Sequence, residues 1–346
     1  MLKLEVPHTP LFAHYFEREF KDGFPRLAGL TVRLYGSEDG HVGGYDWTVQ
    51  HFLSRFSEFS PQLQSLSLSL PKDNIEDCDG IGDLDFFETS FRNITYLRIR
   101  TDTDSARFVL KSCQRLVSVD IRLHANKEWV PADAYPLVAA CLRRLYIFCA
   151  EPEHAPTLLE ELMENTTCPH LQTFSLSTQN DEEEVKLTSL TAAIERLSLR
   201  SEAASGMEAL SIHRLYLPNL DRIIELVPNL KELDITEPHT KHNKILKDSV
   251  VQRLSASGML SNIRSIAITG RRYWGEQKFE KMIRAVVRHV SQPVIVKVVL
   301  HEECTPINGG RISRSLYQEK QLEMTIIQPD SEDEGEWIQW WFGGRK

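Results

Sequence analysis

Apolar residues recur along this chain in a short phrase, L-x-x-L-x-L, in which an apolar anchor precedes two further apolar residues that alternate with polar ones. Such alternation has the period of a strand that buries only one face. The ten copies have their apolar residues at Leu27, Leu30, Val32; Leu63, Leu66, Leu68; Ile94, Leu97, Ile99; Leu116, Val119, Ile121; Leu142, Leu145, Ile147; Leu171, Phe174, Leu176; Ile194, Leu197, Leu199; Leu230, Leu233, Ile235; Ile263, Ile266, Ile268; and Ile295, Val298, Leu300. Each phrase therefore predicts one short strand.

The segments between the phrases are long enough for a helix and two turns. Successive anchors are 22 residues apart from Ile94 to Leu116 and 36 apart from Leu27 to Leu63. Apolar residues with helical spacing occur in two of these segments, at Val49, Phe52, Leu53 and Phe56, and at Phe279, Met282, Ile283, Val286, Val287 and Val290. The sequence therefore predicts a repeat in which parallel strands alternate with helices.

Proline and cysteine mark the same register independently. The prolines two residues before an anchor are Pro25, Pro61, Pro169, Pro228 and Pro293. Proline there ends a preceding helix and presets an extended entry to the strand. Cysteine stands three residues before the anchor at Cys113 and Cys168, where we expect a small buried residue of the turn. The rival architecture, a doubly wound α/β domain, predicts strands apolar on both faces and a glycine-rich phosphate turn, which this sequence lacks.

The phrases resemble those of the leucine-rich-repeat superfamily. The two that run from Cys113 to Ile121 and from Cys168 to Leu176 resemble the repeats of F-box/leucine-rich-repeat proteins, especially fungal-type ones. The resemblance covers residues 24–327 and implies an α/β fold, a curved horseshoe solenoid of about ten irregular repeats with a parallel concave sheet and convex helices. It also implies substrate recognition as an adaptor of an SCF-type, cullin-containing ubiquitin ligase.

The chain departs from this pattern in two places. The asparagine usual eight residues after the anchor is absent, so we expect irregular repeats. Residues 1–23, predicted to be an N-terminal capping segment with Leu2, Leu4 and Val6 in a strand, are too few for an F-box. Binding of a Skp1-type linker is therefore expected only if an F-box exists elsewhere. Residues 328–346, acidic and then rich in tryptophan, are expected to form a C-terminal cap or tail.

Charge and motif content restrict the function further. The chain has 40 Lys and Arg against 49 Asp and Glu, a net charge of -9, which disfavours wholesale binding of nucleic acid or an anionic membrane. It shows neither a signal-peptide pattern nor an apolar run of membrane-spanning length, so we expect a cytoplasmic or nuclear protein. Because catalytic motifs and metal-ligand spacings are missing from the sequence, we expect neither enzyme activity nor a metal or cofactor.

Positions three, five and seven of each phrase are predicted to point away from the core onto the concave sheet. Arginine and aromatic residues gather near these positions in the third to fifth phrases, at Arg98, Arg100, Arg122, Arg143, Arg144, Tyr146 and Phe148. Since arginine and exposed aromatic residues are enriched at binding hot spots, we interpret this group as a contact surface for an acidic or phosphorylated segment of a protein partner. The alternative is a set of solvated arginines balanced by Asp120 and other nearby acids.

The sequence thus favours a protein–protein interaction module. Two other interpretations stay open at this point. One is a free-standing scaffold or inhibitor that is unrelated to ubiquitination, and the more remote one is an enzyme whose site is dispersed over the concave face.

Overall fold

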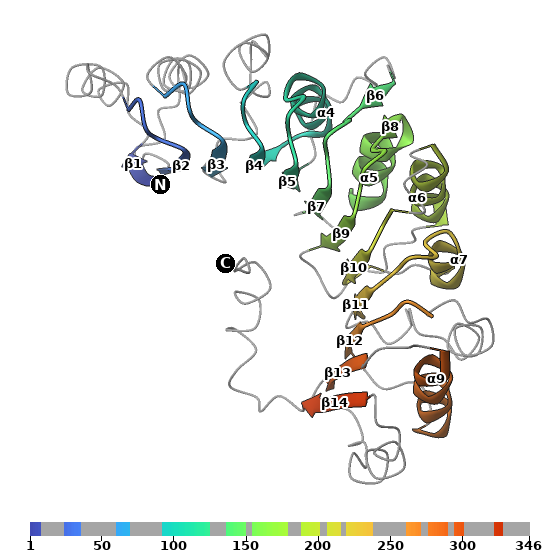
Figure 1. Ribbon diagram of the computed structural model, residues 1–346. Helices are drawn as coiled ribbons and strands as arrows, with labels where there is room; N and C mark the ends of the chain where they lie inside the picture. The colour runs from blue at the N-terminus through green and yellow to red at the C-terminus, as the bar shows by residue number, and fades with distance from the viewer. Residues whose placement is uncertain are drawn as a thin grey trace. The chain divides into compact units, whose positions relative to one another are not determined.

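The protein is an α/β protein with a large parallel sheet, as the computed structural model in Figure 1 shows. The residues that the structure describes are 1–7, 24–35, 60–69, 92–124, 136–149, 154–178, 188–200, 206–215, 219–237, 261–270, 276–289, 294–300 and 322–327. The chain divides into two compact units, a first unit of Met1–Phe174 with Arg196–Ala203 and a second of Ser175–Glu195 with Ala204–Lys346. The two units are described separately below.

The first unit consists of parallel strands that follow one another in chain order, with helices on one face. Its strands in the large sheet are β1 (Leu2–Pro7), β2 (Gly29–Tyr35), β3 (Ser65–Ser69), β4 (Tyr96–Thr101), β5 (Ser118–Leu123) and β7 (Arg144–Cys149). Its helices are α4 (Thr103–Ser112), α5 (Ala155–Glu164) and the end of α6 (Thr188–Arg200). The short strands β6 (Leu137–Val138) and β8 (Thr166–Thr167) form a separate parallel pair.

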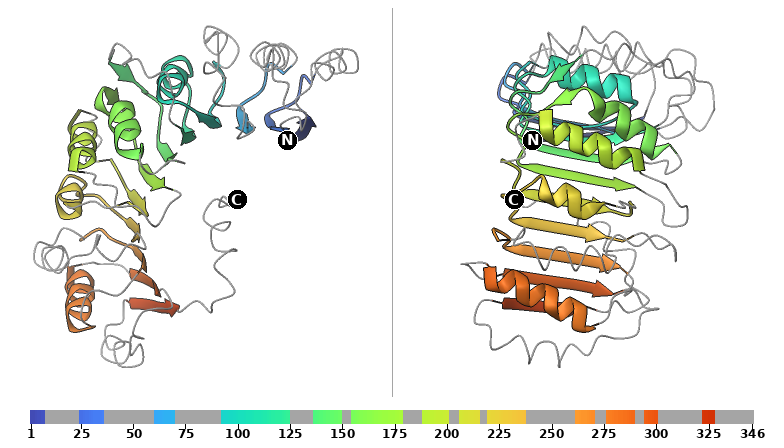
Figure 2. Two further views of the ribbon diagram at one scale, coloured as in Figure 1. Left: turned by 180° about the vertical axis from the view of Figure 1, so that it is seen from behind. Right: turned by 90° about the vertical axis from the view of Figure 1, so that its right-hand side faces the viewer.

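In this unit α4 and α5 lie on one side of the strands, which both views in Figure 2 show. Over β4, β5 and β7 the other side carries no helix in the described ranges. We call this side of the three strands the open face.

The second unit repeats the same arrangement of strands. Its strands are β10 (Ala209–His213), β11 (Glu232–Thr236), β12 (Ser265–Gly270), β13 (Val294–Leu300) and β14 (Leu322–Ile327), each paired in parallel with the next. Its complete helices are α7 (Leu220–Glu225) and α9 (Glu276–His289). The boundary between the units falls within β9 (Thr173–Thr178) and within α6.

A hydrogen-bonded turn precedes six of the described strands and explains four of the recurrent prolines. The anchor amide donates to the carbonyl three residues earlier, in the pairs Leu27 to Phe24, Leu63 to Ser60, Leu116 to Cys113, Leu142 to Ala139, Leu171 to Cys168 and Leu230 to Val227. Pro25, Pro61, Pro169 and Pro228 therefore occupy the second position of the turn, where a fixed φ is favourable and no amide donor is needed. The cysteines at the first position, Cys113 and Cys168, are buried as predicted.

A second recurrent bond fixes the register between layers. The carbonyl one residue after the anchor accepts from two consecutive amides of the next layer. These carbonyls belong to Ala28, Gln64, Thr95, Val117, Arg143, Glu208 and Lys231. Because the bond recurs at the same place in each layer, the two inward apolar residues of one strand pair with those of the next, as Leu97 with Val119 and Val119 with Leu145.

The core lies between the strands and the helices of each unit. Leu66, Leu97, Val119 and Leu145 are at most 1% exposed, and Phe174 is the largest fully buried side chain among the described residues. Each such burial contributes roughly 1.5–3 kcal/mol relative to exposure, so the stacked phrases supply the main stabilising term.

Most of the predicted strands and one predicted helix are confirmed. Eight of the ten phrases coincide with strands β2, β3, β4, β5, β7, β9, β11 and β12. The alternating N-terminal segment forms β1, which pairs in parallel with β2, and the apolar stripe that begins at Phe279 lies on α9. The predicted helical stripe at 49–56 and the predicted tail at 328–346 lie outside the described residues.

The seventh predicted strand is wrong. Ile194, Leu197 and Leu199 lie on helix α6, where Ile194 and Leu197 are buried and Leu199 is 66% exposed. A residue pair separated by three satisfies helical spacing as well as the phrase, and the neighbouring Ala193 extends the helical stripe. The strand of this layer is β10, whose phrase is Met207, Leu210 and Ile212, all buried.

The tenth phrase is shifted by two residues. In β13, Val296 and Val298 pair with Ile266 and Ile268 and are fully buried, whereas the predicted anchor Ile295 is 49% exposed. The segment VIVKVVL is apolar at nearly every position, so its alternation does not define a phase. Pro293 therefore stands at the anchor position and not two residues before it.

Candidate functional site

The open face of β4, β5 and β7 presents three rows of side chains, because alternate residues of each strand point away from the buried core. The rows, read across the three strands, are Tyr96, Ser118, Arg144; Arg98, Asp120, Tyr146; and Arg100, Arg122, Phe148. The structure thus brings six of the seven predicted residues onto one face. The seventh, Arg143, is an exposed residue that precedes β7, and its carbonyl accepts the Gln172 and Thr173 amides.

The open face is locally cationic in an acidic chain. Its nine positions hold four arginines and one aspartate. The equivalent positions of β10 to β13 in the second unit hold only one lysine, Lys297, against Glu232 and Asp234. The positive charge is therefore specific to β4, β5 and β7, because the equivalent positions of β10 to β13 do not share it.

Asp120, in the middle row, forms an ion pair with Arg98. Its Oδ2 atom lies 2.9 Å from Arg98 Nε, and the residue is 9% exposed. The other carboxylate oxygen, Oδ1, is buried without a hydrogen-bond partner. Burial raises the pKa of Asp120, and the charges of Arg98 and Arg122 oppose this effect. Arg98 is thus largely neutralised within the face.

Arg100 and Arg122 lie directly opposite each other in the third row, on neighbouring strands. The Arg122 guanidinium carbon lies 5.6 Å from the centre of the Phe148 ring, a cation–π arrangement that orients the group. Burial lowers the pKa of Arg122, and the charges of Arg98 and Arg100 lower it further, whereas Asp120 opposes them. Like charges on directly opposed positions repel each other, so this row concentrates positive charge on the open face.

Tyr96 in the first row was not among the predicted site residues. Burial and the charge of Asp120 raise its pKa, so the phenol stays protonated and can donate a hydrogen bond. The alternation that placed Arg98 and Arg100 on this face also places Tyr96 there. The face therefore combines guanidinium and phenol donors with aromatic surface, a composition suited to binding anionic groups of a protein.

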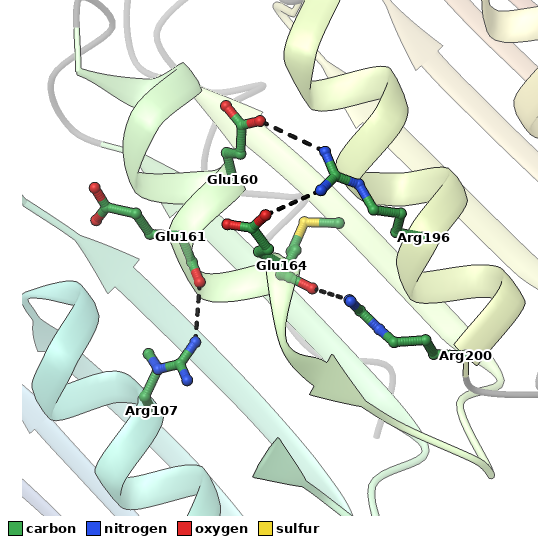
Figure 3. Close-up of polar contacts among 7 residues, drawn as sticks. Arg107, Glu160, Glu161, Glu164, Arg196 and Arg200 are labelled. Atoms are coloured by element: carbon green, nitrogen blue, oxygen red, sulfur yellow. Dashed lines mark hydrogen bonds and ion pairs between the residues drawn. The ribbon is translucent and has the colours of Figure 1, made fainter. Parts of the chain in front are cut away.

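A different polar cluster, on the helical side, serves the structure of the first unit (Figure 3). Side chains satisfy three carbonyls at the C-terminal end of α5. Arg107 Nη1 donates to Glu161 O at 3.1 Å, and Arg200 Nη2 donates to Met163 O at 2.6 Å. Thr166 Oγ1 donates to Leu162 O. The last carbonyls of a helix lack intrahelical partners, and cations there also match the helix dipole. These bonds fix the end of α5 to both neighbouring helices.

Ion pairs complete this cluster. Arg196 Nη1 lies 2.9 Å from Glu164 Oε1, and Arg196 Nη2 lies 3.9 Å from Glu160 Oε1. Arg107, Arg196 and Arg200 thus all donate to acceptors on α5. As positions five and seven of the seventh phrase, Ser198 and Arg200 were predicted to point onto the concave sheet. This is wrong, since both belong to α6.

The second unit has its own group of polar residues on β10 and β11. His213 Nδ1 lies 2.9 Å from Thr236 Oγ1, and burial lowers the pKa of His213 to about 4, so the imidazole is neutral at pH 7. Burial raises the pKa of Asp234 to about 7, an effect opposed by Lys297 and strengthened by Glu232. This group lacks the clustered arginines of the open face.

No protein-family model matches the chain, and no curated protein matches it. Among the helices whose placement is described, none combines the length and apolar content needed to cross a membrane. Within the same ranges, no three His, Cys, Asp or Glu side chains are grouped so that they could hold a metal ion. The open face is therefore characterised by its own chemistry alone.

Proposed function

We propose that this chain is a leucine-rich-repeat solenoid of about ten irregular repeats that binds a protein partner through the open face of its third to fifth repeats. The observation that carries the proposal is the gathering of Arg98, Arg100, Arg122 and Arg144 with Tyr146 and Phe148 on one side of parallel strands. The recurrent turn, the doubly accepting carbonyl and the stacked apolar phrases support the repeat architecture.

The partner segment is acidic. Arginine forms bidentate bonds with carboxylate or phosphate, and the neighbouring rings offer large contact area at low conformational cost. A protein whose net charge is -9 repels most anionic surfaces at long range, so a local basic face selects partners that approach it in one orientation.

Affinity capture from the native cell with two matched variants tests the proposal. Arg100→Glu/Arg122→Glu reverses two charges on the open face, and Arg26→Glu/Arg264→Glu reverses two exposed charges that lie outside it. We expect the first variant to lose the partner by about tenfold or more, as for a hot spot, and the second to retain it. Equal recovery by both variants, with unchanged circular dichroism, contradicts the proposal.

The adaptor role implied by the family resemblance is a separate part of the proposal. A substrate receptor of an SCF-type ligase brings its linker and cullin with it, whereas a scaffold or inhibitor does not. The same capture therefore distinguishes them, because recovery of a Skp1-type linker and a cullin supports the adaptor role and their absence beside a captured partner favours the scaffold.

A further inference from the structure

In the second unit, Asp234 has a buried carboxylate oxygen that no donor satisfies. Alternate side chains of β10 to β13 point away from the core, and α7 and α9 lie on the other side of these strands (Figure 1). We call the side without these helices the second face. Asp234 belongs to this face, and its Oδ1 atom is buried and accepts no hydrogen bond. Such oxygens are rare and costly in folded proteins, which suggests that a ligand supplies the donor.

The residues directly opposite Asp234 on the neighbouring strands are small. They are Ser211 on β10 and Ala267 on β12, and both are only partly buried. The Ala267 side chain has no polar atom, and the Ser211 hydroxyl does not donate to Oδ1. Neither side chain is long enough to cover a carboxylate, so a ligand atom can approach Asp234 from the second face.

The charge of the second face favours a cationic ligand. The outward positions of β10 to β13 hold Glu232 and Asp234 against one cation, Lys297. His213 on the same face is neutral at pH 7, because burial lowers its pKa to about 4. Lys297 lies two strands from Asp234, beyond Ala267, and gives Oδ1 no hydrogen bond. One positive group beside Asp234 would balance the charge of this face.

We infer that Asp234 is the acceptor in a binding site for the ammonium group of a lysine side chain from a protein ligand. A lysine ammonium is a compact charge on a slender four-carbon stem, whereas a guanidinium is planar and bonds best to two oxygens at once. One buried oxygen between small neighbours fits the ammonium better. Ala267 and the diagonally placed Ile295, which is 49% exposed, offer the stem apolar contact. This site is separate from the open face of the first unit.

The titration of Asp234 supports the assignment. Burial raises its pKa to about 7, an effect that Lys297 opposes and Glu232 strengthens. Carboxylates perturbed in this way occur preferentially at functional sites. An ammonium group binds the ionised carboxylate, so retention of a lysine ligand should rise as the pH passes through about 7. An exposed carboxylate would give no such step in this range, because it is ionised throughout.

Immobilised peptide libraries with randomised flanks test the inference. The fixed central residue is lysine in one library, Nε-acetyl-lysine in the second and arginine in the third. We expect the full chain at pH 8 to retain the lysine library about tenfold more than the acetyl-lysine library, as for a hydrogen-bonded charge pair, and also more than the arginine library. Retention of the lysine library should fall at pH 5.5, and free n-butylamine, which carries the same ammonium group, should compete.

Two variants of equal net charge separate this site from the general attraction of cations to an acidic protein. Asp234→Asn and Glu208→Gln each remove one negative charge from the second unit, and Glu208 forms an ion pair with Lys231 before the strands begin. We expect Asp234→Asn to lose the preference for lysine over acetyl-lysine and Glu208→Gln to keep it. Ala267→Leu keeps the carboxylate but adds bulk beside it, so it should also weaken retention.

Several results would overturn the site. A preference for lysine that survives in folded Asp234→Asn assigns the ammonium to another acid, and equal retention of the lysine and acetyl-lysine libraries removes the basis for the site. Equal retention of the lysine and arginine libraries contradicts the choice of an ammonium group. Circular dichroism shows whether each variant is folded, and if Asp234→Asn is not, undiminished retention by Ala267→Leu refutes the placement. Arg100→Glu/Arg122→Glu should keep the preference for lysine, so this site and the proposed function can fail independently.

Discussion

Asp234 on β11 is expected to make the stability of the protein depend on pH, because its carboxyl group is held where ionisation is unfavourable. Burial raises its pKa from 3.8 to about 7. A folded-state pKa above the unfolded one means that no cost exists below about pH 4, where the group is protonated in both states. The cost grows as the pH rises and is complete above about pH 7.

The two pKa values differ by about 3, and each pKa unit corresponds to about 1.4 kcal/mol, so ionised Asp234 costs up to about 4 kcal/mol. Asp234→Asn removes the ionisation while keeping the shape of the side chain. We therefore expect the variant and the parent protein to have similar free energies of unfolding near pH 4. At pH 8 the variant should be more stable by an amount that approaches this limit.

Urea denaturation followed by far-UV circular dichroism between pH 4 and 8.5 measures this difference, since the contributions of all other groups cancel between the two proteins. Two neighbouring charges provide opposite controls. Lys297→Gln removes a charge that lowers the Asp234 pKa and should move the pH-dependent step upward, whereas Glu232→Gln should move it downward. Parallel stability curves for the parent protein and Asp234→Asn would refute the reasoning.

Three further outcomes follow from buried or tightly packed positions. Cys168 is fully buried, and burial raises its thiol pKa to about 12, so it should react with iodoacetamide far more slowly than exposed Cys141. Mass spectrometry measures both labelling rates, and equal rates would contradict the packing of Cys168. Gly270→Ala places a Cβ 2.7 Å from the Cβ of buried Glu237, so thermal unfolding should show a loss of about 1–3 kcal/mol, and an unchanged melting temperature would argue against this contact. Arg200→Met removes a donor from the end of α5 and should cost about 1–2 kcal/mol, which urea denaturation tests against the parent.

The sequence predicts the strands of this fold wherever polar and apolar positions alternate. Leu66-Ser67-Leu68 and Leu97-Arg98-Ile99 define their buried face without ambiguity, and both lie in strands. The prediction is wrong at Ile194–Leu199, since residues separated by three fit a helix equally well, and it is shifted in β13, where valine follows valine. In both places the tertiary packing decides what local periodicity leaves open.

The sequence could predict which residues lie on the face of the candidate site, but not which of them pair with each other. Strand alternation places Arg98, Arg100 and Arg122 on one face, and the same rule would have added Tyr96. The partner of each arginine does not follow from alternation, because it depends on side-chain rotamers and on the register between strands. The structure supplies that step: it pairs Arg98 with Asp120 and places Arg100 directly opposite Arg122.

The arginines that cap α5 also bear on whether this chain could gain, lose or exchange a whole strand–helix layer. Arg107 comes from the preceding helix and Arg200 from the following one, and both end on carbonyls of the same helical turn. A transplanted α5 layer would therefore arrive without its donors, and a deleted one would leave two guanidinium groups on the helical side without their acceptors. Recombination in this part of the chain should succeed only when three consecutive layers move together.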